Sequence, residues 1–219
     1  MIRHLWSGKV NTKWAGIVLV VVTLISSGCA SMSGDECVTS DWRGIGYEDG
    51  ARGYSGDRLG QHRKACAKHG VTPDLEAYQT GRTAGLREFC QPQRGFNLGS
   101  SGGRYNVVCA YDLEADFLDA YRTGSQLHSL RADVNSASSQ IYSKEREMET
   151  VVGLIREAEA GVIASETSVQ DRILLLADLK EYSERTGQLE SEREVLIEQR
   201  AISQRELDSF EAVLADTGY

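Results

Sequence analysis

The feature that most constrains the fold is a long stretch without proline that runs from Leu113 to the end of the chain. In it, apolar residues recur with alternating spacings of three and four, first over 113–162 and again over 172–214, as in coiled-coil helices. Residues 165–168, Ser-Glu-Thr-Ser, separate the two runs, and Asp171 follows Ser168 at the spacing of a helix capping box. The sequence therefore predicts an antiparallel coiled-coil hairpin over 113–219 with a turn near 163–168.

A turn at this place also predicts which residues of the two runs meet. Large side chains then oppose small ones near residue 120, as close packing requires, and Arg131 opposite Arg200 is a mismatch. The alternative is a parallel dimer, in which each helix packs against a second copy of the chain. In that case the helices hold an oligomer together. The expected pairs include Glu159 with Arg172, Ile155 with Leu175, Val152 with Leu179, Gly124 with Leu207 and Ala120 with Phe210.

Residues 1–28 have the pattern of a lipoprotein signal peptide that ends before Cys29. An apolar run at 15–25 follows basic residues, and small residues at 26–28 come directly before the cysteine. The run is shorter than the roughly 20 residues of a membrane-spanning helix, and an ordinary secretory signal is the alternative. Ser26 departs from the leucine most frequent at that position. We expect cleavage before Cys29 and acylation of its thiol, which would anchor the protein to a membrane. The basic residues of the signal are Arg3, Lys9 and Lys13.

Ala30 and Ser31 resemble the sorting signal of bacterial lipoproteins destined for the outer membrane, because no aspartate follows the cysteine. This resemblance implies a lipid-anchored protein of the outer membrane, facing the periplasm. Without residues 1–28 the formal charge falls from −8 to −11, since three basic and no acidic residues are removed. So acidic a chain is not expected to bind nucleic acid, or anionic lipid headgroups through charge.

The four remaining cysteines form an even set in an oxidising compartment, which favours disulfides. Three pairings are open. A helix predicted over 73–89 would be about 25 Å long and would separate Cys66 from Cys90. We therefore favour Cys37 with Cys66 and Cys90 with Cys109.

A zinc site is the competing interpretation, because His62, Cys66 and His69 share one face of a predicted helix. No fourth ligand is apparent, and the compartment favours a disulfide. We expect no metal and no cofactor, and His62 is expected to be a half-exposed helix residue.

Residues 29–112 predict a small glycine-rich helical module held together by the two disulfides. Three segments, at 46–50, 77–81 and 120–124, share the order small residue, tyrosine, two polar residues, glycine. Glycine costs a helix about 1 kcal/mol relative to alanine, so several in one helix indicate close contact with other backbone. Gly95 and residues 99–103 are instead expected in turns, the latter as a flexible loop. The fold class is thus all-α, a stapled module followed by a helical hairpin.

The module resembles the DUF2799 family of bacterial lipoproteins over residues 37 to 124. The family has no assigned function, so the resemblance implies a domain of unknown function and transfers no catalytic residue. The residues that carry it are Cys37, 41–50, 62–66, 78–81, 85–90, Gly99, Tyr105 and Cys109.

Trp42, Tyr47 and Asp49 are the candidate ligand-binding residues, because aromatic rings beside a carboxylate suit a sugar or peptide. A shared concave pocket would favour binding of a cell-wall fragment or small ligand, and buried rings would favour a scaffold. Asp41 and Asp49 with His62 could act as acid and base in a hydrolase, but their spacing does not support catalysis. We expect a non-enzymatic envelope lipoprotein whose hairpin docks a protein partner or acts as a spacer.

Overall fold

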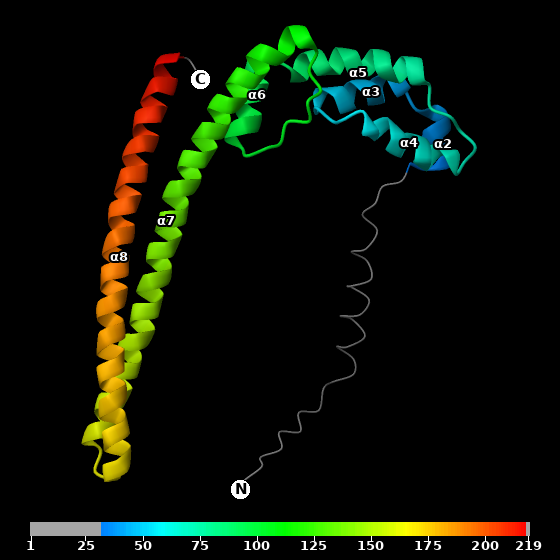
Figure 1. The fold of residues 1–219 in the computed structure, drawn as a ribbon. Helices are drawn as coiled ribbons and strands as arrows, with labels where there is room; N and C mark the ends of the chain where they lie inside the picture. Colours follow the sequence, from blue (N-terminus) through cyan, green and yellow to red (C-terminus); the bar gives the residue numbers. More distant parts are fainter. Residues whose placement is uncertain (1–31, 218–219) are drawn as a thin grey trace, which may run out of the picture.

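The computed structural model describes residues 32–217, and these form helices and connecting segments, with no strand among them. The predicted all-α class is confirmed. A compact group of short helices lies at one end, and two long antiparallel helices project from it (Figure 1). The helices are α2 (Gly34–Thr39), α3 (Trp42–Ala51), α4 (Asp57–Ala67), α5 (Leu75–Phe89), α6 (Pro92–Ser100), α7 (Tyr111–Ile163) and α8 (Val169–Thr217).

Local signals explain where the short helices begin. Ser33 and Glu36 form a reciprocal capping box at the start of α2. Asp41 accepts a hydrogen bond from the backbone of Arg43, and Asp74 caps α5 in the same way. Proline occupies the first turn of α6.

Helices α3 and α5 pack backbone against backbone through four glycines, and we call them the first helix pair. A Cβ atom on Gly46 would overlap the carbonyl oxygen of Tyr78, and one on Gly81 would overlap that of Arg43. Gly50 and Gly85 lie one turn further along and are equally close to the opposite helix. Their lack of side chains allows this contact, as the sequence predicted.

Helix α6 and residues 111–128 of α7 form a second helix pair with the same packing. Gly46, Gly50 and Gly53 recur 49 residues later as Gly95, Gly99 and Gly102, and Tyr78, Gly85 and Phe89 recur 39 residues later as Phe117, Gly124 and His128. Gly95 faces the carbonyl of Phe117 as Gly46 faces that of Tyr78, and Gly102 adopts positive φ against His128 as Gly53 does against Phe89.

The second pair corrects two expectations. Gly95 and Gly99 are helical residues in contact with α7 and are not in turns. Gly124 lies against the backbone of Phe96 and Ser100 in α6, whereas Leu207, its expected partner, clusters with Leu127. Helix α7 therefore takes part in the helix packing of the module well beyond residue 112.

Two disulfides join Cys37 to Cys66 and Cys90 to Cys109, the pairing favoured from the sequence. Each ties the segment before the first helix of a pair to the connection between its helices. The disulfides thus repeat with the glycines, and the two pairs have the same covalent design.

Helices α7 and α8 form the antiparallel hairpin, joined by residues 164–168. Ser168 accepts from the backbone of Asp171 and donates to its carboxylate, as the capping pattern predicted. The predicted register is wrong. Leu175 lies against Gly161, six residues beyond its expected partner Ile155, and Phe210 packs with the cluster around Leu127, seven residues beyond Ala120.

Two further expectations about the hairpin seam are wrong. Arg172 donates to the backbone carbonyls of Val162, Ala164 and Thr167, while Glu159, its expected partner, is exposed. Several buried residues of α7 also lie one position earlier in the sequence than predicted. The face of α7 that packs against α8 is therefore rotated from the expected one. Val151 and Ala158 are buried where Val152 and Glu159 were expected, and Ala137 is buried as well.

Ion pairs along the hairpin join the two helices outside the apolar seam. Arg131 pairs with Glu211 at 2.8 Å, Lys144 with Glu192 at 2.6 Å and Arg193 with Glu145 at 3.0 Å. Arg131 therefore finds a carboxylate, which removes its predicted clash with Arg200.

In the described part of the chain, no helix combines the length and apolarity needed to cross a membrane.

Candidate functional site

Asp49 is the one buried charged side chain in the described part of the chain, with 8% of its side chain exposed. It lies on α3, where the first helix pair meets α4. A buried carboxylate is costly unless its oxygens are paired, so its partners define the candidate site.

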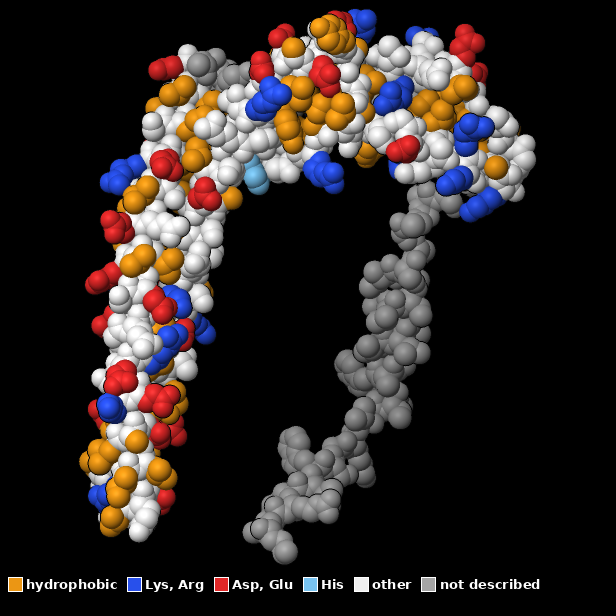
Figure 2. All heavy atoms as spheres, in the orientation of Figure 1, with side chains coloured by type: hydrophobic (Ala, Val, Ile, Leu, Met, Phe, Trp, Pro, Cys, Tyr) orange, Lys and Arg blue, Asp and Glu red, His pale blue; other side chains and the backbone are white. Residues whose placement is uncertain are grey.

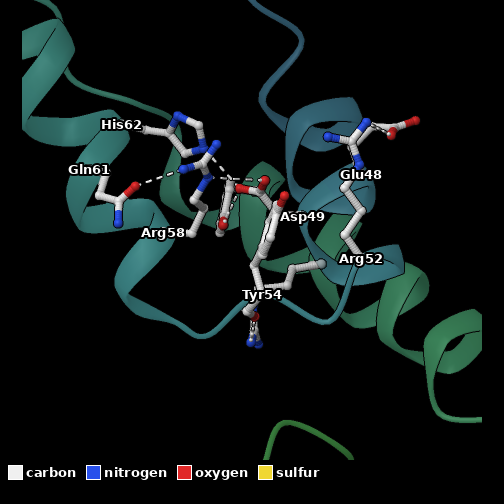
Figure 3. A network of polar contacts seen from close by, with 9 residues as sticks. Glu48, Asp49, Arg52, Tyr54, Arg58, Gln61 and His62 are labelled. Atoms are coloured by element: carbon white, nitrogen blue, oxygen red, sulfur yellow. Dashed lines mark hydrogen bonds and ion pairs between the residues drawn. The ribbon is translucent and has the colours of Figure 1, made fainter. Parts of the chain in front are cut away.

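Three side chains surround this carboxylate (Figure 3). The hydroxyl of Tyr78 donates to Oδ2 at 2.9 Å, and Nε2 of His62 lies 2.8 Å from the same oxygen. Nε of Arg58 lies 3.7 Å from Oδ1, beyond hydrogen-bond distance. We call Asp49, Arg58, His62 and Tyr78 the Asp49 cluster. It joins α3 to both α4 and α5.

The chemistry of Tyr78 fits the role of a fixed donor. Burial raises the pKa of Tyr78 well above its usual value, and its hydrogen bond to the carboxylate of Asp49 raises the pKa further. The phenol therefore stays protonated and continues to donate to the carboxylate.

Arg58 lies at the solvent-facing edge of the cluster. Its guanidinium stands over the ring of Tyr54 at 5.0 Å, and its Nη1 donates to Gln61 at 2.8 Å. Its Nε is buried and makes no hydrogen bond. Arg82 donates to the carbonyl of Tyr54 at 3.0 Å.

His62 is enclosed by rings as well as by the carboxylate. Its side chain is only 14% exposed, and Trp42 and Tyr78 contact it edge-on, with centroids 6.2 and 6.1 Å away. The expectation of a half-exposed histidine is therefore wrong. Bound in this way, the imidazole serves to hold α4 against the first helix pair.

The second helix pair provides an internal comparison. The residues equivalent to Asp49 and Tyr78 are Leu98 and Phe117, which belong to one apolar cluster. This way of packing therefore needs no polar residue at either position. The connection in the second pair, residues 101–110, also contains no helix, whereas the first pair contains α4. The polar cluster and α4 thus occur together.

The predicted ligand site does not assemble. Trp42 lies in the core with Cys37, Cys66 and Tyr78, and Asp49 is buried, but Tyr47 is 42% exposed. These three residues do not share an exposed surface. Residues 1–31, including the lipidation site Cys29, lie outside the described part of the chain.

The alternative zinc site is excluded by the disulfide. The sulfur of Cys66 is bonded to Cys37 and is not available as a thiolate ligand. The structure groups no three metal-ligating side chains between residues 32 and 217.

Sequence reasoning missed the roles of Arg58 and Tyr78 and the equivalence of the two helix pairs. The signal was present, because Gly-Tyr-x-x-Gly-x-x-Gly at 46–53 recurs as Gly-Phe-x-x-Gly-x-x-Gly at 95–102. The tyrosine motif obscured it, since 120–124 matches 81–85 and not 77–81 in the structure.

Residues 41–126 match a family model described as protein of unknown function (DUF2799). No curated protein and no solved structure matches the chain. The matched residues span both glycine-packed helix pairs and the Asp49 cluster, and this part of the chain, residues 41–126, belongs to the DUF2799 family.

Proposed function

We propose that this protein is a non-enzymatic lipoprotein of the outer membrane, anchored through Cys29 and facing the periplasm, whose hairpin docks a protein partner. The anchor rests on the signal-peptide pattern before Cys29. The docking role rests on the free end of the hairpin.

The main support for the docking role is a group of large apolar side chains that are exposed where α7 and α8 meet the turn. Ile163 is 82% exposed, and Ile173 and Leu174 are each 63% exposed. Figure 2 shows hydrophobic side chains gathered at this free end. Apolar groups concentrated on a surface mark interaction sites more often than isolated ones do. The group, which we call the apolar tip, consists of Ile163, Val169, Ile173, Leu174 and Leu176.

The surroundings of the tip favour a protein over a lipid surface. Exposed carboxylates of Glu159, Glu166 and Asp171 flank it, and an anionic membrane would repel them. The occupant that fits is a protein with an apolar groove bordered by basic residues. Helix α7 is about 80 Å long, so such a partner would be held far from the module.

The interior of the module supports a scaffold over a ligand-binding domain. Trp42 fills the core beside the Cys37–Cys66 disulfide, and the polar groups around Asp49 bind one another.

Photo-crosslinking in intact cells tests the docking role. A photoreactive residue at Leu174 or Val169 of the full chain should capture the same protein, whereas one at Glu190, exposed on α8 far from the tip, should not. Leu176→Glu should abolish capture at both tip positions. Equal capture at Glu190, or capture of lipid alone, would reject the tip as a protein-docking site.

Labelled palmitate tests the anchor independently. Label should enter the wild-type chain and be absent from Cys29→Ala. An unlabelled wild type would reject the lipoprotein assignment whatever the crosslinking shows.

A further inference from the structure

The exposed face of α4 is basic, although the chain as a whole is acidic. Between Asp57 and Asp74 there is no carboxylate, while Arg58, Arg63, Lys64 and Lys68 all fall in this segment. The last three are exposed, and we call them the basic face. Figure 2 shows Lys and Arg side chains gathered at this end of the module.

A hollow beside the basic face could receive an anionic group. It has a volume of about 440 Å³ and lies between the end of α4 and the segment that leads to α5. Arg63 and Lys64 line it on one side, and residues 70–73 line it on the other.

Covalent links keep the basic face close to the proposed lipid anchor. The Cys37–Cys66 disulfide joins α4 to α2, which begins at Gly34. Gly34 is five positions along the chain from Cys29, and five positions can span at most about 18 Å. His62, bound to Asp49, also fixes α4 against the first helix pair. The face therefore cannot lie far from the surface that holds the acyl chains.

We propose that the basic face binds the phosphate groups of anionic phospholipids in the leaflet that holds Cys29. The proposal rests on the proposed anchor and adds a second contact to it. Three basic side chains at an anionic surface strengthen membrane association on the order of 100-fold. Asp35 and Glu36 of α2 oppose this attraction, but Glu36 is engaged in the capping box with Ser33.

The acidic hairpin does not cancel this attraction. The hairpin projects from the end of the module opposite α2 and α4 (Figure 1), and screening at physiological salt limits charge interactions to about 8 Å. The charge near the surface is therefore set by α4 and not by the net charge of the whole chain. Repulsion of the acidic hairpin would help to direct it away from the membrane.

Protection of lysines from acetylation tests the contact in the full acylated protein. The protein is reconstituted into vesicles of phosphatidylcholine alone or mixed with phosphatidylglycerol. Lys64 and Lys68 should be acetylated several-fold more slowly in the mixed vesicles, and high salt should remove the difference. Lys180, 80% exposed on the hairpin, is the internal control and should react equally in both.

A variant strengthens the test and separates it from the anchor. Arg63→Gln with Lys64→Gln should return Lys68 to the rate seen in phosphatidylcholine, whereas the control Arg122→Gln on α7 should not. Equal rates in both vesicle types would overturn the proposal while leaving the anchor intact. Failure of the wild type to float with either vesicle would instead reject the anchor.

Discussion

Asp49 and Leu98 occupy equivalent positions in two helix pairs that pack through the same glycine contacts, yet one is a buried carboxylate and the other a leucine. The residues that contact them differ in the same way. Tyr78 donates a hydrogen bond to Asp49, whereas Phe117 packs in the apolar cluster that includes Leu98. The polar pair can be replaced by the apolar pair through mutation. The change in the free energy of unfolding then measures what the polar pair contributes to stability.

We predict that Asp49→Leu alone destabilises the module by about 3 kcal/mol, because the hydroxyl of Tyr78 and the imidazole of His62 lose their buried acceptor. Adding Tyr78→Phe should recover about 1 kcal/mol, since the orphaned hydroxyl is then removed. Denaturant unfolding of the two single variants and the double variant gives the coupling energy. Strictly additive losses would show that the two side chains do not act as a pair.

Glycine substitutions should separate packing from helix propensity. Gly85→Ala places a methyl group on the carbonyl of Tyr47 and should cost about 3 kcal/mol, because two backbones must move apart. Gly187→Ala on α8 meets no atom within 4 Å and should stabilise the hairpin by about 1 kcal/mol. Thermal unfolding of both variants makes the comparison. A tolerated Gly85→Ala would contradict the close contact of α3 and α5.

The raised pKa of Tyr78 predicts a loss of stability in alkali. Above pH of about 10 the unfolded chain releases this proton while the folded chain keeps it, so the free energy of unfolding falls as pH rises. The fall should be shallower in Tyr78→Phe, which lacks the group. Urea unfolding of both proteins at neutral and alkaline pH measures the two slopes, and equal slopes would refute the assignment.

Arg172 should hold the turn of the hairpin. Its guanidinium donates to three backbone carbonyls at the end of α7 and in the connection, so Arg172→Met should loosen the turn by about 2 kcal/mol. Amide hydrogen exchange should accelerate around the turn and remain unchanged in the module. Arg200→Met, at an exposed position of α8, is the matched control and should leave exchange near the turn unaltered.

The disulfides predict that residues 32–217 contain no reactive thiol. Replacing both Cys37 and Cys66 with alanine should cost about 3 kcal/mol, because the bond closes a loop over a separation of 29 residues. Thiol labelling of the native protein and unfolding of the double variant check the two statements. Labelling of two cysteines under native conditions would contradict the structure.

Local signals in the sequence were sufficient for much of the fold. Ser168 and Asp171 marked the start of α8, and glycines at helical spacing predicted close contact with other backbone, which α3 and α5 provide for each other. The helix between Cys66 and Cys90 argued against joining these two cysteines, and the pairing favoured on that ground is the one observed.

The register of the hairpin could not be obtained in this way. Val151 and Val152 are chemically identical, so the pattern did not decide which of them faces α8. The position of Leu175 against Gly161 depends on the geometry of the turn. Arg172 binds backbone carbonyls there, and because every residue has such a carbonyl, the sequence does not mark which ones are bound. The Asp49 cluster was only partly visible for a similar reason, because its members come from three helices far apart in the sequence.

Helix α7 is shared between the second helix pair and the hairpin without a break over its 53 residues. Such an element acts as a rigid lever: a tilt of about 5° at the glycine contacts would move its far end, about 60 Å away, by about 5 Å. At Gly95, Gly99 and Gly124 the backbones pack directly, with no side chain between them that could deform. The point about which α7 would tilt is therefore stiff. Force applied at the turn is therefore carried to the disulfide-bonded helices at the other end of the molecule.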